Sequence, residues 1–155
     1  MEKPDLEALQ FHLQDIVEED AGETKVWSSG DAHFGKLPYV YLSNDQKQQH
    51  LAHSKNSQGT PAYTLFATSP PGSKQRGRPN EPDFVGILLT MVRLEQQKTD
   101  VIIAINVPHI AGQYEPSEVD PDKGKHGPLL EKAIDYRRRV METFEVRDWG
   151  LFVQE

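Results

Sequence analysis

The chain has 155 residues, 17 basic and 24 acidic side chains, a formal net charge of −7 and 36% hydrophobic residues. We expect a single domain over residues 1–155 and no membrane span, because no run approaches the roughly 18 apolar residues that a span needs. The lack of cysteine excludes disulfides, thiolate nucleophiles and cysteine-bound zinc, and together with a polar Met-Glu-Lys-Pro-Asp start it favours the cytosol or nucleus.

Acidic side chains are concentrated at the beginning of the chain. The first 24 residues hold eight acids and only Lys3 as a base. This argues against nucleic acid as a partner and favours a basic protein surface. Residues 18–23 are predicted to form an acidic turn, in which Glu18, Glu19 and Asp20 are candidates for contact with that partner. The alternative is a solvated, charged surface.

Several strands are predicted in the first half of the chain. Leu9, Phe11 and Leu13 alternate with polar residues, a pattern typical of a half-buried strand over residues 9–14. Further strands are predicted at 37–42 and 62–68, and 43–61 and 69–82 are predicted to be polar, mobile insertions.

The strongest pattern lies at residues 84–94 and 101–107, which are apolar on both alternating faces. This pattern is typical of central strands that are covered on both sides, and the short linker predicts an antiparallel hairpin. An amphipathic helix is predicted from Gly127 to about Phe144 and can cover one face of the sheet. We expect the second cover to come from outside this chain.

The sequence contains only weak matches to motifs for nucleotide binding, metal binding or catalysis. Residues 30–36 match the start of a phosphate-binding loop, but Leu37 replaces its Ser/Thr, so a glycine-containing turn is the simpler interpretation. His50 and His53 lack an evident third ligand. We therefore predict no catalytic residue, no metal and no cofactor. Arg137, in the middle of the apolar arc of the helix, either extends its head group to the rim or pairs with Asp15 or Asp100.

Three stretches carry a family resemblance. They are residues 9–16 (LQFHLQDI), residues 92–108 (VRLEQQKTDVIIAINVP) and residues 144–152 (FEVRDWGLF). In this order they resemble the Ran guanine nucleotide release factor family of nuclear-import proteins. The resemblance implies an α+β fold, an antiparallel sheet sandwiched between helices and similar to PsbP. Members carry a further strand, turn and acidic stretch upstream of the part that matches Leu9, so we expect an incomplete fold here.

The resemblance also implies a function. The expected partner is a Ran-type GTPase, whose nucleotide release the chain would promote as a regulator without an active site of its own, in nuclear import, within the nucleus and possibly the cytoplasm. Arg93, Gln96, Thr99 and Asp100 are the partner-binding candidates of the middle stretch, although Thr99 and Asp100 are more typical of a turn than of a binding site. Two alternatives remain, an interaction module without release activity and a P-loop hydrolase.

Overall fold

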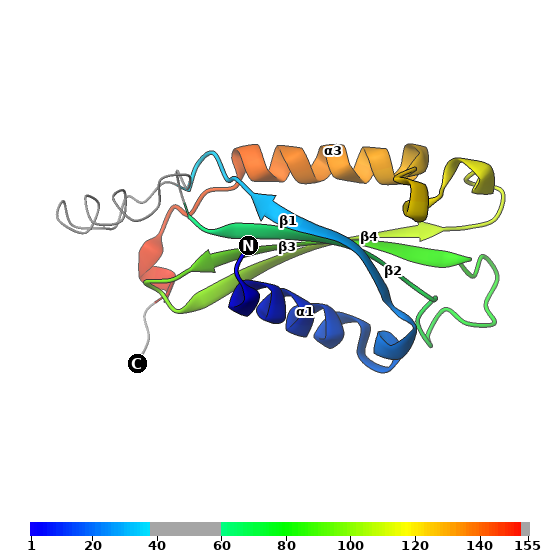
Figure 1. Cartoon of the computed structure of the whole chain (residues 1–155), viewed down its shortest axis with the longest axis horizontal. Coiled ribbons are helices and arrows are strands. Elements are labelled where there is room, and N and C mark those ends of the chain that lie inside the picture. Colours follow the sequence, from blue (N-terminus) through cyan, green and yellow to red (C-terminus); the bar gives the residue numbers. More distant parts are fainter. Residues whose placement is uncertain (38–59, 153–155) are drawn as a thin grey trace.

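The computed structural model describes residues 1–37 and 60–152. Within them a four-stranded antiparallel sheet lies between α1 on one face and α3 on the other (Figure 1). The elements, with η marking a 3-10 helix, are α1 (Lys3–Val17), η1 (Glu18–Glu23), β1 (Lys25–Ala32), β2 (Ala62–Ser69), β3 (Phe84–Leu94), β4 (Thr99–His109), η2 (Pro116–Glu118), η3 (Pro121–Lys123), α3 (Gly127–Thr143) and η4 (Trp149–Phe152). The predicted α+β sandwich is thus confirmed. None of the described helices is long and apolar enough to cross a membrane.

Helix α1 occupies the place of the strand predicted over residues 9–14, and that prediction is wrong. Leu9, Leu13 and Val17 are four residues apart, so a helix with 3.6 residues per turn places them on one face, and all three are buried. Phe11, which a strand would set beside Leu9, is 66% exposed. Pro4 lies in the first turn of α1, where proline is typical of a helix start. The alternating pattern favoured a strand in spite of this signal.

The sheet is a meander in the order β1-β2-β3-β4, each strand antiparallel to the next. Strand β2 and the β3–β4 hairpin confirm the predictions for 62–68, 84–94 and 101–107. Strand β1 was not predicted, because its side chains are exposed or half-buried and it contains Gly30 and two serines. Its pairing with β2 forms the strand in spite of these weak propensities.

Strand β4 lies at an edge of the described sheet, and the prediction that both hairpin strands are central is wrong for it. Of the two hairpin strands in the described sheet, only β3 has a neighbour on each side, β2 and β4, and most of its side chains are buried. The apolar character of both faces of β4 has another cause. Ile102 packs in the core beneath α1, whereas Ile103 and Ile105 pack on the α3 side.

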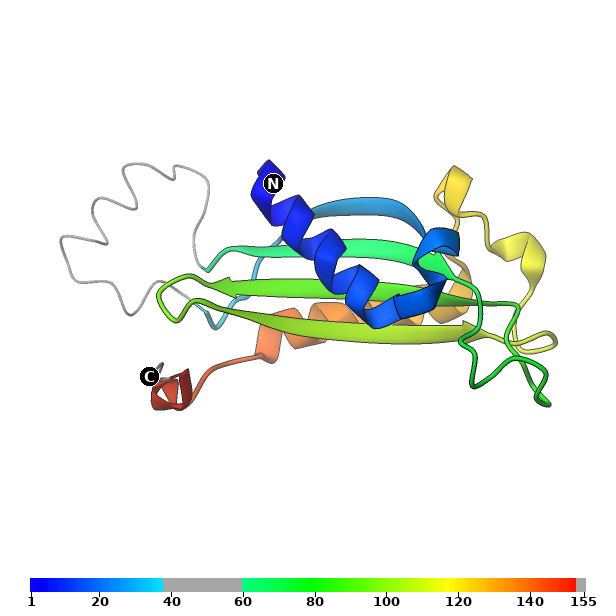
Figure 2. The same ribbon diagram turned by 90° about the horizontal axis from the view of Figure 1, so that it is seen from below.

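Helix α1 is the second cover that we expected from outside the chain, and that expectation is also wrong. It lies across the face of the sheet opposite α3 (Figures 1 and 2). Leu9 and Leu13 of α1 join Leu65 and Leu89 of the sheet in one buried cluster. Each fully buried leucine contributes about 1.5–3 kcal/mol of transfer free energy. The sheet therefore has an apolar core on each face.

Helix α3 confirms the predicted amphipathic helix, with Leu130 and Ala133 buried on its sheet-facing side. The segment that resembles a phosphate-binding loop is instead part of the sheet and core, because Gly30 pairs with Thr64 in the sheet and Phe34 is 1% exposed. The chain between β2 and β3 forms hydrogen-bonded turns, including Gln75 N–H to the Gly72 carbonyl. Its mobility stays a prediction. The strand predicted at 37–42 and the insertion at 43–61 lie mostly outside the described residues.

Candidate functional site

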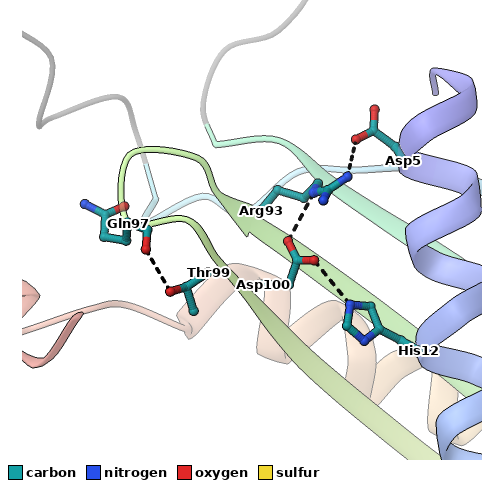
Figure 3. Close-up of polar contacts among 6 residues, drawn as sticks. All are labelled: Asp5, His12, Arg93, Gln97, Thr99 and Asp100. Carbon is teal, nitrogen blue, oxygen red and sulfur yellow. Dashed lines mark hydrogen bonds and ion pairs between the residues drawn. The ribbon is translucent and has the colours of Figure 1, made fainter. Parts of the chain in front are cut away.

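A cluster of four charged or titratable side chains joins α1 to the β3–β4 hairpin (Figure 3). Arg93 and Asp100 are direct partners in the β3–β4 register, and Arg93 Nε donates to Asp100 Oδ1 at 3.1 Å. From α1, Asp5 Oδ1 accepts from Arg93 Nη1 at 3.0 Å, and His12 Nε2 lies 3.2 Å from Asp100 Oδ2. Asp5 and His12 are seven residues apart, about two helical turns, and so face the hairpin together. These contacts connect helix α1 to the β3–β4 hairpin.

In this cluster the Arg93 guanidinium is shared between two carboxylates. The side chains of Arg93, Asp5 and Asp100 are 28%, 17% and 21% exposed. Burial lowers the pKa of Arg93, but the carboxylates of Asp5 and Asp100 outweigh burial, and the pKa lies above its ordinary value. Burial, followed by the Asp5 carboxylate, raises the pKa of Tyr63. Arg93 and Asp100, predicted as partner-binding residues, are therefore engaged within the fold, where they hold α1 on the sheet.

Thr99 and Gln96 lie where the hairpin turns. Thr99 Oγ1 donates to the Gln97 carbonyl at 2.9 Å (Figure 3), and Lys98 adopts a left-handed backbone with φ of 49°. Thr99 thus has the turn-forming role that we weighed against partner binding. Gln96 is exposed. A cavity of about 390 Å³ lies beside the cluster, lined by Asp5, Arg93, Leu94, Glu95, Lys98, Thr99 and Asp100.

The predicted acidic turn is the 3-10 helix η1, and its three candidate residues differ. Glu18 and Glu19 are exposed, whereas Asp20 is 8% exposed and forms an ion pair with Arg76 from the loop between β2 and β3. Asp20 thus anchors that loop to the end of α1. Of the three candidates, Glu18 and Glu19 are thus exposed to a partner, and contact of Asp20 with a partner stays a prediction.

Sequence reasoning missed the exposed aromatic residue on α1. Phe11 is 66% exposed on the outer face, and Ile16 is 37% exposed one and a half turns later. Glu7 and Asp15, each four residues from Phe11, are exposed and lie on the same side of the helix. The four-residue spacing of Leu9, Leu13 and Val17 was the signal that could have placed Phe11 outside.

Arg137 has neither of the predicted pairings. Asp15 belongs to α1, on the opposite face of the sheet, and Asp100 is engaged with Arg93 and His12. Arg137 is half-buried, and burial lowers its pKa. It lines a small cavity between α3 and the sheet.

The described residues contain no group of three or more histidine, aspartate or glutamate side chains arranged to hold a metal ion. His50 and His53 lie outside the described residues. The prediction of no metal or cofactor stays a prediction.

Comparison with known proteins places this chain in a family. Searches of curated proteins and of solved structures found no match, so the predicted likeness to PsbP stays a prediction. A family model described as Ran-interacting Mog1 protein matches residues 1–108, which span α1 and nearly the whole sheet and end before α3. Because the match covers more than two thirds of the 155 residues, the chain belongs to the Ran-interacting Mog1 family.

Proposed function

We propose that this protein binds the GTPase Ran through the outer face of α1 and η1, promotes release of its guanine nucleotide, and thereby acts in nuclear import. The observation that carries the proposal is the family match over residues 1–108, since membership implies interaction with Ran. The release activity, the role in import and the nuclear location go beyond that match and rest on the resemblance of the three sequence stretches.

The outer face of α1 supports binding to a basic protein surface. Phe11 offers an exposed aromatic ring, and Glu7, Asp15, Glu18 and Glu19 are exposed acids around it or at the end of the helix. Aromatic anchors with a polar rim account for much of the energy of typical protein interfaces. Acidic side chains at the rim accelerate encounter with a basic partner and make it depend on salt. Phe11 is therefore the proposed anchor, with the acids steering association.

The proposed mechanism of release is thermodynamic. A protein that binds nucleotide-free Ran more tightly than loaded Ran must, by reciprocal linkage, weaken nucleotide binding by the same factor. No acid, base or nucleophile is required from this chain. It would act as a regulator of the GTPase.

The test is a titration of nucleotide-free and GDP-loaded Ran, followed by calorimetry and by release of a fluorescent nucleotide. We expect tighter binding to nucleotide-free Ran and faster release. Phe11→Ala should weaken binding at least about tenfold, equivalent to about 1.4 kcal/mol, because an anchor is removed. Leu151→Ala is the matched control, since Leu151 is 79% exposed but lies in η4.

Two results would contradict the proposal at different levels. Absence of binding to either form of Ran at low salt would refute the Ran interaction of this chain. Binding without faster release would refute the release activity and favour the alternative of an interaction module. Replacing Glu18 and Glu19 together by glutamine should slow association and reduce its salt dependence, with less effect on dissociation.

A further inference from the structure

A small cavity lies on the α3 side of the sheet, away from α1. It has a volume of about 180 Å³ and is bounded by β1, β2, β3 and α3. Its polar lining includes Ser28, Thr64, His126 and Arg137, and its apolar lining includes Phe66, Leu88 and Ile134. Gly30 stands opposite Thr64, and Ser28 opposite Phe66, in the β1–β2 register. The cavity lies outside the charge cluster and outside the proposed Ran-binding face.

Arg137 is the charged group of this cavity, and no described residue pairs with it. Its neighbours on α3 behave differently. Arg138 bonds Asp135 and Glu142, and Arg139 bonds Asp135, although both arginines are exposed. Arg93, the half-buried arginine on the other face, holds two carboxylates. Arg137 is half-buried and lacks such a partner among residues 1–37 and 60–152, an arrangement that costs stability because the guanidinium loses water without gaining an anion.

One further polar group at the cavity lacks a partner within the described chain. The Nδ1 atom of His126 is buried and makes no hydrogen bond with the described residues. The imidazole ring packs edge-on against Phe66, with 5.5 Å between the ring centroids. The hydroxyls of Ser28 and Thr64 add two groups that can donate hydrogen bonds. The cavity thus combines a cation without a partner in the described chain, one buried imidazole nitrogen without a hydrogen bond there, two hydroxyls and an apolar wall.

We propose that this cavity is a binding site for a carboxylate carried on a short hydrocarbon chain, with the carboxylate bound by Arg137. A planar guanidinium binds a carboxylate through two parallel hydrogen bonds. Phe66, Leu88 and Ile134 accommodate the hydrocarbon part. The apolar wall favours such a ligand over inorganic phosphate, which would lose its water on that side without any compensating contact.

The first experiment follows backbone amide resonances by NMR while butyrate is added at constant ionic strength, with phosphate and chloride in parallel. Saturable shifts of Ser28, Thr64 and the residues around Arg137 with butyrate are the expected result. Arg137→Met should weaken this binding at least about tenfold, equivalent to about 1.4 kcal/mol. Arg138→Met is the matched control on the neighbouring, exposed position and should leave butyrate affinity unchanged.

A second experiment uses thermal stability and separates a ligand site from a structural role. If Arg137 serves to bind a ligand, Arg137→Met should raise the melting temperature in anion-poor buffer. The reason is that an apolar side chain of similar length replaces an unpaired, half-buried cation. Butyrate should raise the melting temperature of the natural protein but not that of Arg137→Met. A structural role predicts the reverse, a destabilised variant.

The proposal is overturned if butyrate gives no saturable shift at these residues, if phosphate alone binds, or if Arg137→Met binds butyrate as well as the natural protein does. The carboxylate could belong to a free small molecule or to an acidic side chain of a protein partner. Competition separates these sources and is the one arm that rests on the proposed Ran interaction. Simultaneous binding of butyrate and Ran is expected if Ran binds the α1 face, and it indicates a free carboxylate. Displacement of Ran by butyrate would indicate a carboxylate of Ran in the cavity and would overturn the assignment of Ran binding to the α1 face alone.

Discussion

Arg93 on β3 lies opposite Asp100 on β4, and the same guanidinium reaches Asp5 on α1, so one side chain holds a strand pair and a helix together. Replacing Arg93 by alanine leaves two partly buried carboxylates without their cation. We expect a loss of about 2 kcal/mol in the free energy of unfolding, a value reduced from that of a fully buried pair because the side chains are 17–28% exposed. Urea denaturation of the natural protein and of Arg93→Ala measures this difference in the free energy of unfolding.

The control for this substitution is Arg147→Ala. Arg147 bonds Glu145 at 2.9 Å, but its side chain is 87% exposed, so its removal should change the unfolding free energy by less than about 0.5 kcal/mol. Equal losses in the two variants would show that the Arg93 cluster does not hold α1 on the sheet.

The two faces of α1 should respond oppositely to truncation. Leu9 is 0% exposed and Phe11 66% exposed. Leu9→Ala should cost about 2–5 kcal/mol through lost burial and a cavity, whereas Phe11→Ala should change stability by less than about 0.5 kcal/mol. Chemical denaturation of both variants gives the comparison. Similar losses would fit the strand that the alternating pattern predicted, in which Leu9 and Phe11 share a buried face.

The sequence predicted those elements whose pattern depends on local periodicity. Strands β2 and β3 and helix α3 carry strong apolar signals over 8, 11 and 17 residues. Helix α1 was misread because Leu9, Phe11 and Leu13 fit a period of two as well as a helix that exposes one aromatic residue. Strand β1 forms through its pairing with β2, which is a tertiary effect. Its serines and glycine have low strand propensity, so the local sequence does not predict it.

The candidate site could be predicted only in part. Arg93 and Asp100 were found through the family resemblance, but their partners Asp5 and His12 come from the helix that was misread. Asp20 was grouped with Glu18 and Glu19 because sequence shows charge and not burial. Its pairing with Arg76 joins residues 56 positions apart, which no local pattern reveals.

The close approach of α3 to β3 depends on Gly86. A Cβ atom added at this position would lie 2.8 Å from Cδ2 of Leu130, which is itself 0% exposed and has little room to move. Gly86→Ala should therefore lower the unfolding free energy by about 1–3 kcal/mol through overpacking. Gly30→Ala is the matched strand control, because nothing lies within 4 Å of its added Cβ. Thermal unfolding of the two variants tests this, and a stable Gly86→Ala protein would contradict the close packing.

His109 at the end of β4 should make stability depend on pH. Its side chain is fully buried, stacks on Phe84 with ring centroids 4.1 Å apart, and contacts Tyr114 edge-on, while Asp83 bonds the Tyr114 hydroxyl at 2.6 Å. Burial lowers the pKa of His109 below its ordinary 6.5, outweighing the Val107 carbonyl and the Asp83 carboxylate, which raise it. The unfolded chain therefore binds the proton more readily than the folded one.

The sign of this effect follows from proton linkage. The stability contributed by neutral His109 is complete above pH 6.5, the ordinary pKa, and is lost as the pH falls below that value toward the lowered folded pKa, at up to about 1.4 kcal/mol per pH unit. Unfolding free energies measured by urea denaturation between about pH 5 and 8 should fall more steeply toward acid for the natural protein than for His109→Gln. Parallel curves for the two proteins would show that His109 does not titrate differently in the folded and unfolded states.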